Sequence, residues 1–319
     1  KLEGAHPVIE HILRFRELQK LLSTYIDNIP QMVGKDGRLH SIFVQTGTTT
    51  GRISSKDPNM QNIPARGEHG DEIRRAFRAE KGFKLVALDY SQIELRVLAL
   101  LSKDKTLTRI LQEGADVHTA VASHVFSVPL DAVTKDMRRK AKVINFGIIY
   151  GMGITSLQRA LKSTREEAQT FYDGYFKKFP GVAKYIEHIK QETAERGYTE
   201  TFFGRRRYIE GIHSNIEYVR SAAERMAVNA PIQGTATGDI IKLAISRADE
   251  KLRAEGLEGK AFLLLQVHDE LVYEVKEDTV PYAVPLIKNI MEHIVKTEIP
   301  FAVDVSVGEN WGEMRKIKE

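Results

Sequence analysis

"LLLQVHDELVYEV", residues 263–275, places a histidine and two carboxylates, His268, Asp269 and Glu270, between two apolar runs. The flanking segments are rich in Leu, Val and Tyr, which predicts two strands joined by a tight turn, at Phe262–Val267 and Leu271–Val275. Such a turn holds a carboxylate on a rigid base at the edge of a sheet, which suits catalysis. The alternative is that the acids only form the turn, because Asp is a common turn residue.

A second apolar run also ends in an acid. The segment KLVALD, residues 84–89, predicts a buried strand that ends at Asp89. If the two strand ends met, carboxylates about 4 Å apart would repel by roughly 4 kcal/mol at an effective dielectric constant near 20. Such a pair requires a cation, and because the chain has no cysteine, its ligands must be oxygen or imidazole. A hard divalent ion fits, Mg²⁺ first and Mn²⁺ second, and Mg²⁺ favours substrate phosphates as further ligands.

The composition is that of a soluble globular protein. The chain has 319 residues, 42% of them hydrophobic, which is enough for a substantial core, and the net charge of +4 says little about partners. No stretch approaches the roughly 18 unbroken apolar residues of a membrane span, and the first residues lack the pattern of a secretory signal. We therefore expect no membrane partner. The absence of cysteine fits a reducing compartment.

A run of basic residues, KDMRRKAK at 135–142, begins a predicted helix that Thr134 would cap. Four side chains recur every four residues and share one side of this helix: Arg138, Lys142, Phe146 and Tyr150. The positive helix end and the two cations would hold an anion, while the rings would offer flat faces to a base and a sugar. Taken alone, the spacing fits an ordinary amphipathic helix with aromatic residues in the core. Together with the acid pair, it favours a nucleotide.

The rest of the chain predicts an α+β protein. Periodic apolar residues indicate a helix at 7–27, and small polar residues dominate 34–64 except for a β-like piece at 40–46. A largely helical stretch covers 105–200, with breaks at Gly114, Pro129, Gly151–Gly153 and Pro180. We expect two more helices in 214–254, interrupted at Pro231 and Gly234, and a last strand at Phe301–Val305. A sheet built from strands this far apart in sequence is typical of α+β proteins.

These motifs, in this order, resemble those of the polymerase domain of the DNA polymerase I family, also called family A, over nearly the whole chain. Three motifs carry most of the resemblance: Asp89-Tyr-Ser-Gln-Ile-Glu-Leu-Arg96; Arg138-Arg-Lys-Ala-Lys142 through Asn145-Phe-Gly147 to Tyr150-Gly151; and Gln266-Val-His-Asp-Glu270. Smaller matches are Thr50-Gly-Arg52, Asn59-Met-Gln-Asn62, and the set Arg225, Asn229 and Gln233. A single match could be chance, whereas the ordered set is specific.

The resemblance implies a right-hand polymerase fold, with an antiparallel palm sheet, a helical fingers insertion and most of the thumb missing. The expected parts are a thumb-base helix at 1–34, a palm at 35–105 and 211–319, and fingers at 106–210. No separate acidic exonuclease cluster has room in this sequence, so we do not expect proofreading from it.

The implied activity is template-directed DNA synthesis, in which deoxynucleotides are added to a primer 3′-hydroxyl by nucleotidyl transfer. The resemblance implies two Mg²⁺ ions, with Mn²⁺ as a substitute, and two-metal catalysis is a general polymerase mechanism. Asp89 and Asp269 are expected to hold the ions together with the backbone of Tyr90, with Glu270 as a supporting acid. Lys142 is expected to protonate the leaving pyrophosphate.

The resemblance also implies which side chains bind each substrate. The deoxynucleoside triphosphate is expected to contact Arg138, Lys142, Phe146, Tyr150, His118, Gln92 and Glu94. Within this set, Glu94 with Tyr150 would block the 2′-hydroxyl of a ribonucleotide. Primer-template DNA is expected to contact Arg52, Asn59, Gln61, Arg225, Asn229, Gln233, Gln266 and His268. In the minor groove such donors sense acceptors that every correct base pair shares.

We expect a monomer whose partners are primer-template DNA and deoxynucleoside triphosphates, located in the cytoplasm (nucleoid) if the source is bacterial, or in an organelle matrix. Three alternatives remain. A single-subunit RNA polymerase would share the palm, but Glu94 argues against it. A catalytically idle DNA-binding scaffold would have lost an acid, whereas Asp89 and Asp269 are both present. A metal-dependent nuclease gives no reason for the basic and aromatic helix.

Overall fold

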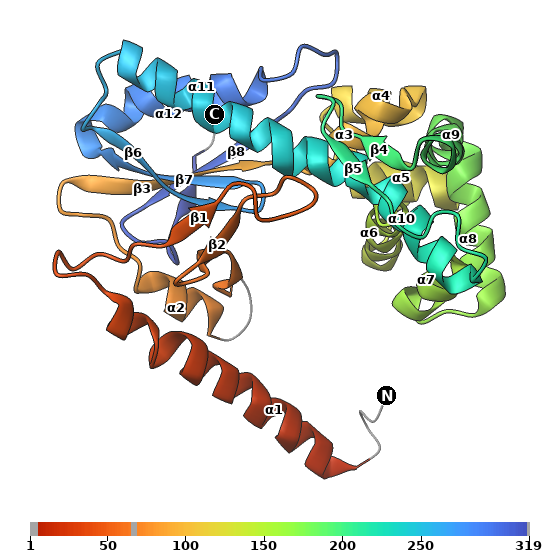
Figure 1. Ribbon diagram of the computed structural model, residues 1–319, viewed down its shortest axis with the longest axis horizontal. Helices are drawn as coiled ribbons and strands as arrows, with labels where there is room; N and C mark the ends of the chain where they lie inside the picture. The colour runs from red at the N-terminus through yellow and green to blue at the C-terminus, as the bar shows by residue number, and fades with distance from the viewer. Residues whose placement is uncertain (1–5, 65–68, 318–319) are drawn as a thin grey trace.

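The computed structural model describes residues 6–64 and 69–317. Figure 1 shows two lobes, one built around a sheet and the other made mostly of helices, with one long helical rod running from one to the other. Parts of the predicted thumb-base and palm ranges, residues 1–5, 65–68 and 318–319, lie outside the described residues.

Five antiparallel strands form the central sheet, in the order β6–β7–β3–β8–β9. Their bounds are β3 Phe83–Tyr90, β6 Ala261–Val267, β7 Glu270–Lys276, β8 Val303–Gly308 and β9 Arg315–Lys316. The predicted antiparallel sheet of distant segments is confirmed. The predicted bounds of the last strand were wrong, because Phe301 is buried in the core before the strand begins. An apolar residue in the sequence indicates burial, but it does not show where a strand begins to pair.

Alternation along β3 buries both faces of the sheet. Val86, Leu88 and Tyr90 point into the larger core, beneath the helices α11 (Ile241–Ala254) and α12 (Val280–Glu292). Figure 1 shows these two helices together over that face.

The opposite face of β3 carries the acid. Leu85 and Ala87 point into a second core that includes Met60 and Trp311. This face lies toward β1 (Ile42–Val44), β2 (Ser54–Lys56) and α2 (Gly70–Arg75) (Figure 1). Because side chains alternate along a strand, Asp89 follows Leu85 and Ala87 onto this face, at the point where apolar packing ends.

The second lobe is made mostly of helices. Its helices are α3 Ile93–Ser102, α4 Lys105–Gln112, α5 Val117–Phe126, α6 Lys135–Ile149, α7 Ile154–Leu161, α8 Arg165–Lys178 and α9 Pro180–Arg196. The predicted breaks are confirmed: Gly114 has a φ of +66°, and Pro180 occupies the first turn of α9. A short hairpin follows, with strands β4 Tyr198–Glu200 and β5 Arg206–Tyr208. The remaining short helical turns are Ile29–Met32, Met60–Asn62, Leu130–Ala132 and Glu277–Thr279.

The rod joining the lobes corrects one prediction. Helix α10 (Glu217–Gln233) runs through Pro231, continues as the π-helix η5 (Gly234–Ile240) and passes directly into α11. The interruption expected at Pro231 was therefore wrong, whereas at Gly234 the α-helix does end and gives way to the π-helix. All seven residues of η5 are buried. Tertiary packing therefore outweighs the low helix propensity of proline and glycine.

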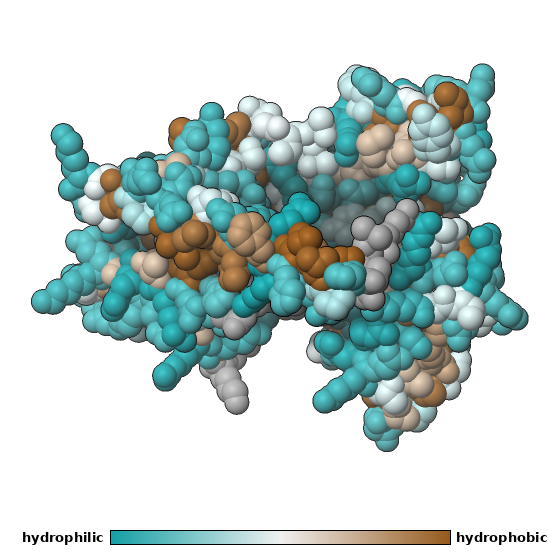
Figure 2. Space-filling view, turned by 90° about the horizontal axis from the view of Figure 1, so that it is seen from below, coloured by the Kyte–Doolittle hydropathy of each residue, from teal (hydrophilic) through white to brown (hydrophobic). Residues whose placement is uncertain are grey.

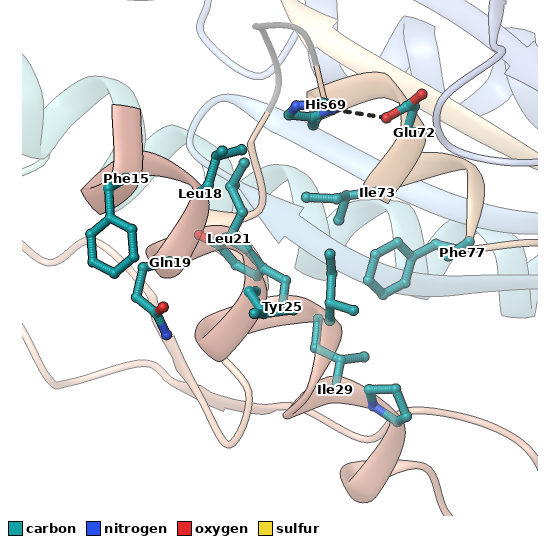
Figure 3. A pocket seen from close by; sticks show the side chains of 14 residues that line it. Phe15, Leu18, Gln19, Leu21, Tyr25, Ile29, His69, Glu72, Ile73 and Phe77 are labelled. Atoms are coloured by element: carbon teal, nitrogen blue, oxygen red, sulfur yellow. Dashed lines mark hydrogen bonds and ion pairs between the residues drawn. The ribbon is translucent and has the colours of Figure 1, made fainter. Parts of the chain in front are cut away.

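The N-terminal helix α1 (Pro7–Leu21) ends in a π-turn, Leu22–Ile26, which confirms the predicted helix. None of the residues of α1 is buried. An apolar groove of about 750 Å³ lies between this segment and α2, lined by side chains that include Leu18, Tyr25 and Phe77 (Figure 3). Within the described residues, no helix combines the length and apolar character needed to cross a bilayer.

Candidate active site

The ends of two strands bring the predicted acids together. In the β3–β7 pairing, Asp89 lies opposite Glu270, and the backbone N–H of Tyr90 donates to the carbonyl of Asp269 over 3.2 Å. His268 and Asp269 form the two-residue turn between β6 and β7, with His268 at a φ of +57°. The two carboxyl groups are close enough for the charge of Asp269 to raise the pKa of Asp89. Two acids that are far apart in the chain therefore share one site.

The electrostatics of this pair require a positive charge. Burial raises the pKa of Asp89 to about 8, and the neighbouring charges of Asp269, Glu270 and Asp304 add to the rise. Burial also raises the pKa of Asp269, against the opposing charges of His268 and Arg52. Two neighbouring carboxyl groups with raised pKa values favour taking up a proton or binding a cation, because either one relieves the repulsion between like charges.

The donor set fits a magnesium site completed by substrate. Among residues 6–64 and 69–317, no group of three or more His, Cys, Asp or Glu side chains is placed to hold a metal by itself. Mg²⁺ prefers one or two carboxylates plus phosphate oxygens to a full protein cage. Two carboxylates with a strand-end carbonyl at Tyr90 match that preference.

Two further acids flank Asp89. Burial raises the pKa of Glu270, and the charge of Arg74 opposes the rise. On the other side, Asp304 lies opposite Asp89 in the β3–β8 pairing and forms an ion pair with Lys316, 2.9 Å apart. Asp304 was not among the site residues predicted from the sequence. The alternation of Val303, Asp304 and Val305 was the available signal, but it does not reveal which strand lies alongside.

The basic helix is α6, and its N-terminal cations face an internal anion. Thr134 caps the helix by accepting from the N–H of Met137 over 3.2 Å, as predicted. Arg138 binds Asp116 through two hydrogen bonds of 3.0 and 2.8 Å. Lys142 is exposed and its ammonium lies 6.0 Å from the ring centre of Phe146. The cations and the aromatic ring thus lie in sequence along one helix.

The far end of α6 contacts the first motif. Tyr150 ends the helix, and its hydroxyl lies 3.5 Å from Oε2 of Glu94. Burial raises the pKa of Glu94, while Arg52 opposes the rise. Gln92 has a left-handed φ of +54° and turns the chain from β3 into α3. The turn at Gln92 places Glu94 in the first turn of α3, where it contacts Tyr150.

His118 lies behind α6. It is 4% exposed, and Nδ2 of Asn145 donates to its Nδ1 over 3.0 Å, which leaves Nε2 as the donor of the ring. Its ring centre lies 5.8 Å from that of Phe146. Burial lowers the pKa of His118, so it is a neutral donor rather than a cation at neutral pH.

Three predicted DNA contacts lie along α10, one turn apart: Arg225, Asn229 and Gln233. Asn229 donates to the carbonyl of Ile149 at the end of α6, over 3.4 Å. Gly151 lies so close to Arg225 that an added Cβ would be 2.9 Å from its Cγ. Arg52 contacts η5 through a 2.7 Å hydrogen bond from its Nε to Thr237. The structure thus brings these residues to the junction of the lobes.

The remaining predicted DNA contacts lie at the β6–β7 turn or near it in the fold: Asn59, Gln61, Gln266 and His268. Gln61 donates to the side-chain oxygen of Gln266 over 2.8 Å, and Gln266 donates to the carbonyl of His268 over 2.7 Å. Gln266 is buried, and its amide donates within the protein. Asn59 is exposed and caps the turn Met60–Asn62. Direct contact of these four residues with DNA stays a prediction.

An antiparallel sheet with paired acids at its rim and a basic helix in a second lobe is the architecture of right-hand nucleic-acid polymerases. Figure 2 shows the molecular surface hollowed between the two lobes. The chain belongs to DNA polymerase family A, whose model matches residues 1–313. The family resemblance and the right-hand fold expected from the sequence are therefore confirmed.

The relatives are bacterial polymerases. The chain is 51% identical to the thermostable DNA polymerase I of Thermus aquaticus over 97% of its own length and 37% of that protein. It is 47% identical to DNA polymerase I of Pseudomonas aeruginosa over 95% of its length and 33% of that protein. A solved structure, the POL domain of Pol1 from M. smegmatis in complex with DNA primer-template and dNTP, matches with a TM-score of 0.92 at 41% identity, covering 97% of this chain and 54% of that one. The chain spans about a third of the length of these curated relatives.

Proposed function

We propose that the chain catalyses template-directed DNA synthesis, adding deoxynucleotides to a primer 3′-hydroxyl with release of pyrophosphate. The observation that carries this proposal is that the β3–β7 register and the backbone bond from Tyr90 to Asp269 bring Asp89 and Asp269 to one end of the sheet. Membership of family A and the basic helix α6 in the other lobe support it.

In this proposal Asp89 and Asp269 hold two Mg²⁺ ions together with the carbonyl of Tyr90, and Mn²⁺ can substitute. The ions supply electrostatic stabilisation of the attacking and leaving oxygens. Glu270 supports the pair from the neighbouring register position, opposite Asp89. Lys142 donates a proton to the leaving pyrophosphate, a role that its exposure and place on α6 allow.

We assign the incoming nucleotide to the face of α6 and its neighbours. Arg138, Lys142 and Nε2 of His118 bind the triphosphate by charge-assisted hydrogen bonds. Phe146 lies against the sugar, and Tyr150 lies near the templating base. Gln92 lies beside the sugar-facing Glu94.

Primer-template DNA is assigned to the junction of the lobes. Arg52, Arg225, Asn229 and Gln233 supply donors to the minor groove near the primer end, with Asn59, Gln61, Gln266 and His268 at or behind the same surface. Groove acceptors occupy the same places in every correct pair, so these donors sense pair geometry without reading sequence. The M. smegmatis structure, which contains DNA primer-template and dNTP, supports these two partners. We further propose that the chain acts as a monomer in the bacterial cytoplasm.

Extension of a primed template with Mg²⁺ tests the proposal. Asp269→Ala should lower extension on the order of a thousandfold, since metal-ion stabilisation is worth several kcal/mol, while primer-template binding persists. Asp173→Ala, which removes an exposed acid on α8, serves as the control and should extend as the wild type does. Extension by Asp269→Ala at the wild-type rate would reject the metal-site assignment.

The second candidate function is that of a single-subunit RNA polymerase. Glu94 distinguishes it from a DNA polymerase. Its carboxylate contacts Tyr150 at 3.5 Å, which would place a barrier against a 2′-hydroxyl. Glu94→Ala should therefore reduce the preference for deoxynucleotides over ribonucleotides by at least about tenfold. A wild type that prefers ribonucleotides would favour the RNA polymerase, and an unchanged preference in the variant would reject the steric role of Glu94.

A further inference from the structure

The π-helix η5 lies directly against the loop that leads to Arg52. A Cβ added at Gly238 would lie 2.7 Å from the carbonyl oxygen of Thr50, and one added at Gly234 would lie 3.1 Å from the same atom. Only glycine permits so close an approach between a helix and another backbone. The two glycines therefore fix the distance between η5 and the residues preceding Arg52.

A second contact locks this loop in place. Asp239, also in η5 and 6% exposed, accepts a 2.8 Å hydrogen bond from Nε of Arg205 and forms an ion pair with its Nη2, 2.7 Å away. The side chain of Arg205 covers Gly51, whose φ is +80°. The backbone before Arg52 is thus held from both sides by groups of one buried π-helix and its ion-pair partner.

The side chain of Arg52 is held by one hydroxyl. Its Nε donates to Oγ1 of Thr237 over 2.7 Å, and this Oγ1 donates to the carbonyl of Gln233 over 3.0 Å. A guanidinium has no acceptor, so the Thr237 proton must point to Gln233 and a lone pair must point to Arg52. The hydroxyl thereby has a single orientation that favours one rotamer of Arg52.

From this position the charge of Arg52 reaches the catalytic groups. It opposes the rise that burial causes in the pKa of Glu94 and of Asp269. It also adds to the lowering that burial causes in the pKa of His268. The charge of Arg52 therefore acts on the proposed metal site, on the proposed sugar contact and on the turn that carries Asp269.

We propose that Thr237 is a positioning residue that holds Arg52 against the terminal base pair of the primer, an inference that rests on the proposed function. Arg52 can favour extension from a correct base pair only if its N–H donors point to the minor-groove acceptors that all correct pairs share. Without the Thr237 hydroxyl, Arg52 keeps its charge but loses this fixed direction. Extension from matched primer ends then falls, whereas extension from mismatched ends, which lack the correct acceptor geometry, changes little.

The test compares Thr237→Val, which keeps the shape and loses the hydroxyl, with Thr237→Ser, which keeps the hydroxyl. Single-nucleotide extension is measured on matched and mismatched primer ends, with kcat and KM, and Tm is measured for each variant. Thr237→Val should lower kcat on matched ends about tenfold, the effect of one hydrogen bond to a charged group, and Thr237→Ser should stay within about twofold of the wild type. Equal losses on both kinds of end, or no rescue by Ser, would overturn the positioning role. If Thr237→Val does not fold, Thr237→Ala is measured against the same expectations.

A double-mutant cycle with Arg52→Ala shows whether Thr237 acts through Arg52. Thr237→Val should cost less than about twofold when added to Arg52→Ala, because coupled residues are not additive. A full tenfold loss in both backgrounds would contradict the inference. The wild type in the same assay separates the two proposals: absent extension rejects the polymerase function, whereas normal extension with an unaffected Thr237→Val rejects only the role of Thr237.

Discussion

At the scale of single residues, the proposed triphosphate site is already filled by an anion of the protein. Asp116 caps α5 by accepting from the N–H of Thr119 over 2.7 Å, and it also binds Arg138 through two hydrogen bonds. A guanidinium binds carboxylate and phosphate with the same paired geometry. A triphosphate that binds the same edge of the Arg138 guanidinium therefore competes with Asp116.

Asp116→Asn should strengthen nucleotide binding. Asn caps a helix as well as Asp does, so α5 is retained while the charge facing Arg138 disappears. An exposed ion pair is worth up to about 1 kcal/mol, so KM for the deoxynucleotide should fall up to about fivefold at unchanged kcat. Steady-state incorporation of one nucleotide measures this. Asp136→Asn is the control, because Asp136 pairs with Arg139 and Lys140 on the same helix, and a KM that falls equally in both variants would contradict the idea.

The same residue predicts an effect of acid on stability. Burial would raise the pKa of Asp116, but hydrogen bonds from Arg138 and Thr119 outweigh it and hold the pKa at about 2, below the ordinary 3.8. A carboxyl with a lowered pKa contributes stability above the ordinary value and loses it as the pH falls through the folded value. The stability difference between wild type and Asp116→Asn should therefore shrink between about pH 4 and pH 2. Urea unfolding at several pH values measures it, and a difference that stays constant over this range would refute the link.

At the scale of elements, the sequence predicts what local patterns determine. The strands β3, β6 and β7 follow from apolar runs that end in acids, and the start of α6 follows from the Thr134 cap, so Asp89 and Asp269 could be found without a structure. The continuity of α10, η5 and α11 could not. Pro231 and Gly234 are local helix breakers, and only the burial of all seven η5 residues reverses that preference.

The parts of the site that sequence did not reveal depend on contacts between distant segments. Asp304 faces Asp89 only through the β3–β8 register, and Thr237 meets Arg52 only because η5 packs against the Thr50 loop. Neither Asp304 nor Thr237 belongs to a sequence motif that indicates a catalytic or binding function. Likewise, Gln266 lies in a matching motif, yet its burial and bond to Gln61 appear only in the fold.

The close packing of η5 gives a prediction for Gly238. Alanine there would bring Cβ to 2.7 Å from the carbonyl oxygen of Thr50, a backbone atom that cannot move alone. Gly238→Ala should therefore lower the free energy of unfolding by about 1–3 kcal/mol, as overpacking does. Gly174→Ala in α8 is the matched control, since its nearest neighbour would be 4.0 Å away, and it should gain up to about 1 kcal/mol of helix propensity. Denaturant unfolding of both variants measures the change in the free energy of unfolding. Equal changes at the two glycines would contradict the close packing at Gly238.

At the scale of the whole molecule, the acid pair belongs to the sheet lobe, and the cations proposed to bind the triphosphate belong to the helical lobe. The hollow between the lobes seen in Figure 2 is where a nucleotide would meet both. The rod of α10, η5 and α11 joins the lobes, and the contact of Gly151 with Arg225 fixes α6 to that rod. A shift of either lobe along the rod would change the distance between Lys142 and the acid pair, so the proposed chemistry depends on an intact rod.

The sheet lobe also exposes an apolar groove away from the proposed site, between α1 and α2. Figure 2 shows brown, hydrophobic residues gathered on the face where α1 lies. Exposed apolar patches of this kind bind apolar molecules, so the 319-residue chain should enhance the fluorescence of anilinonaphthalene sulfonate while fully folded. Leu18→Gln, which makes one wall of the groove polar, should remove at least about half of that signal, because the dye loses a large part of its apolar contact area. Tyr218→Gln, a change at a 75% exposed ring on the other lobe, is the control. A signal lost equally in both variants, or in neither, would show that the dye binds elsewhere.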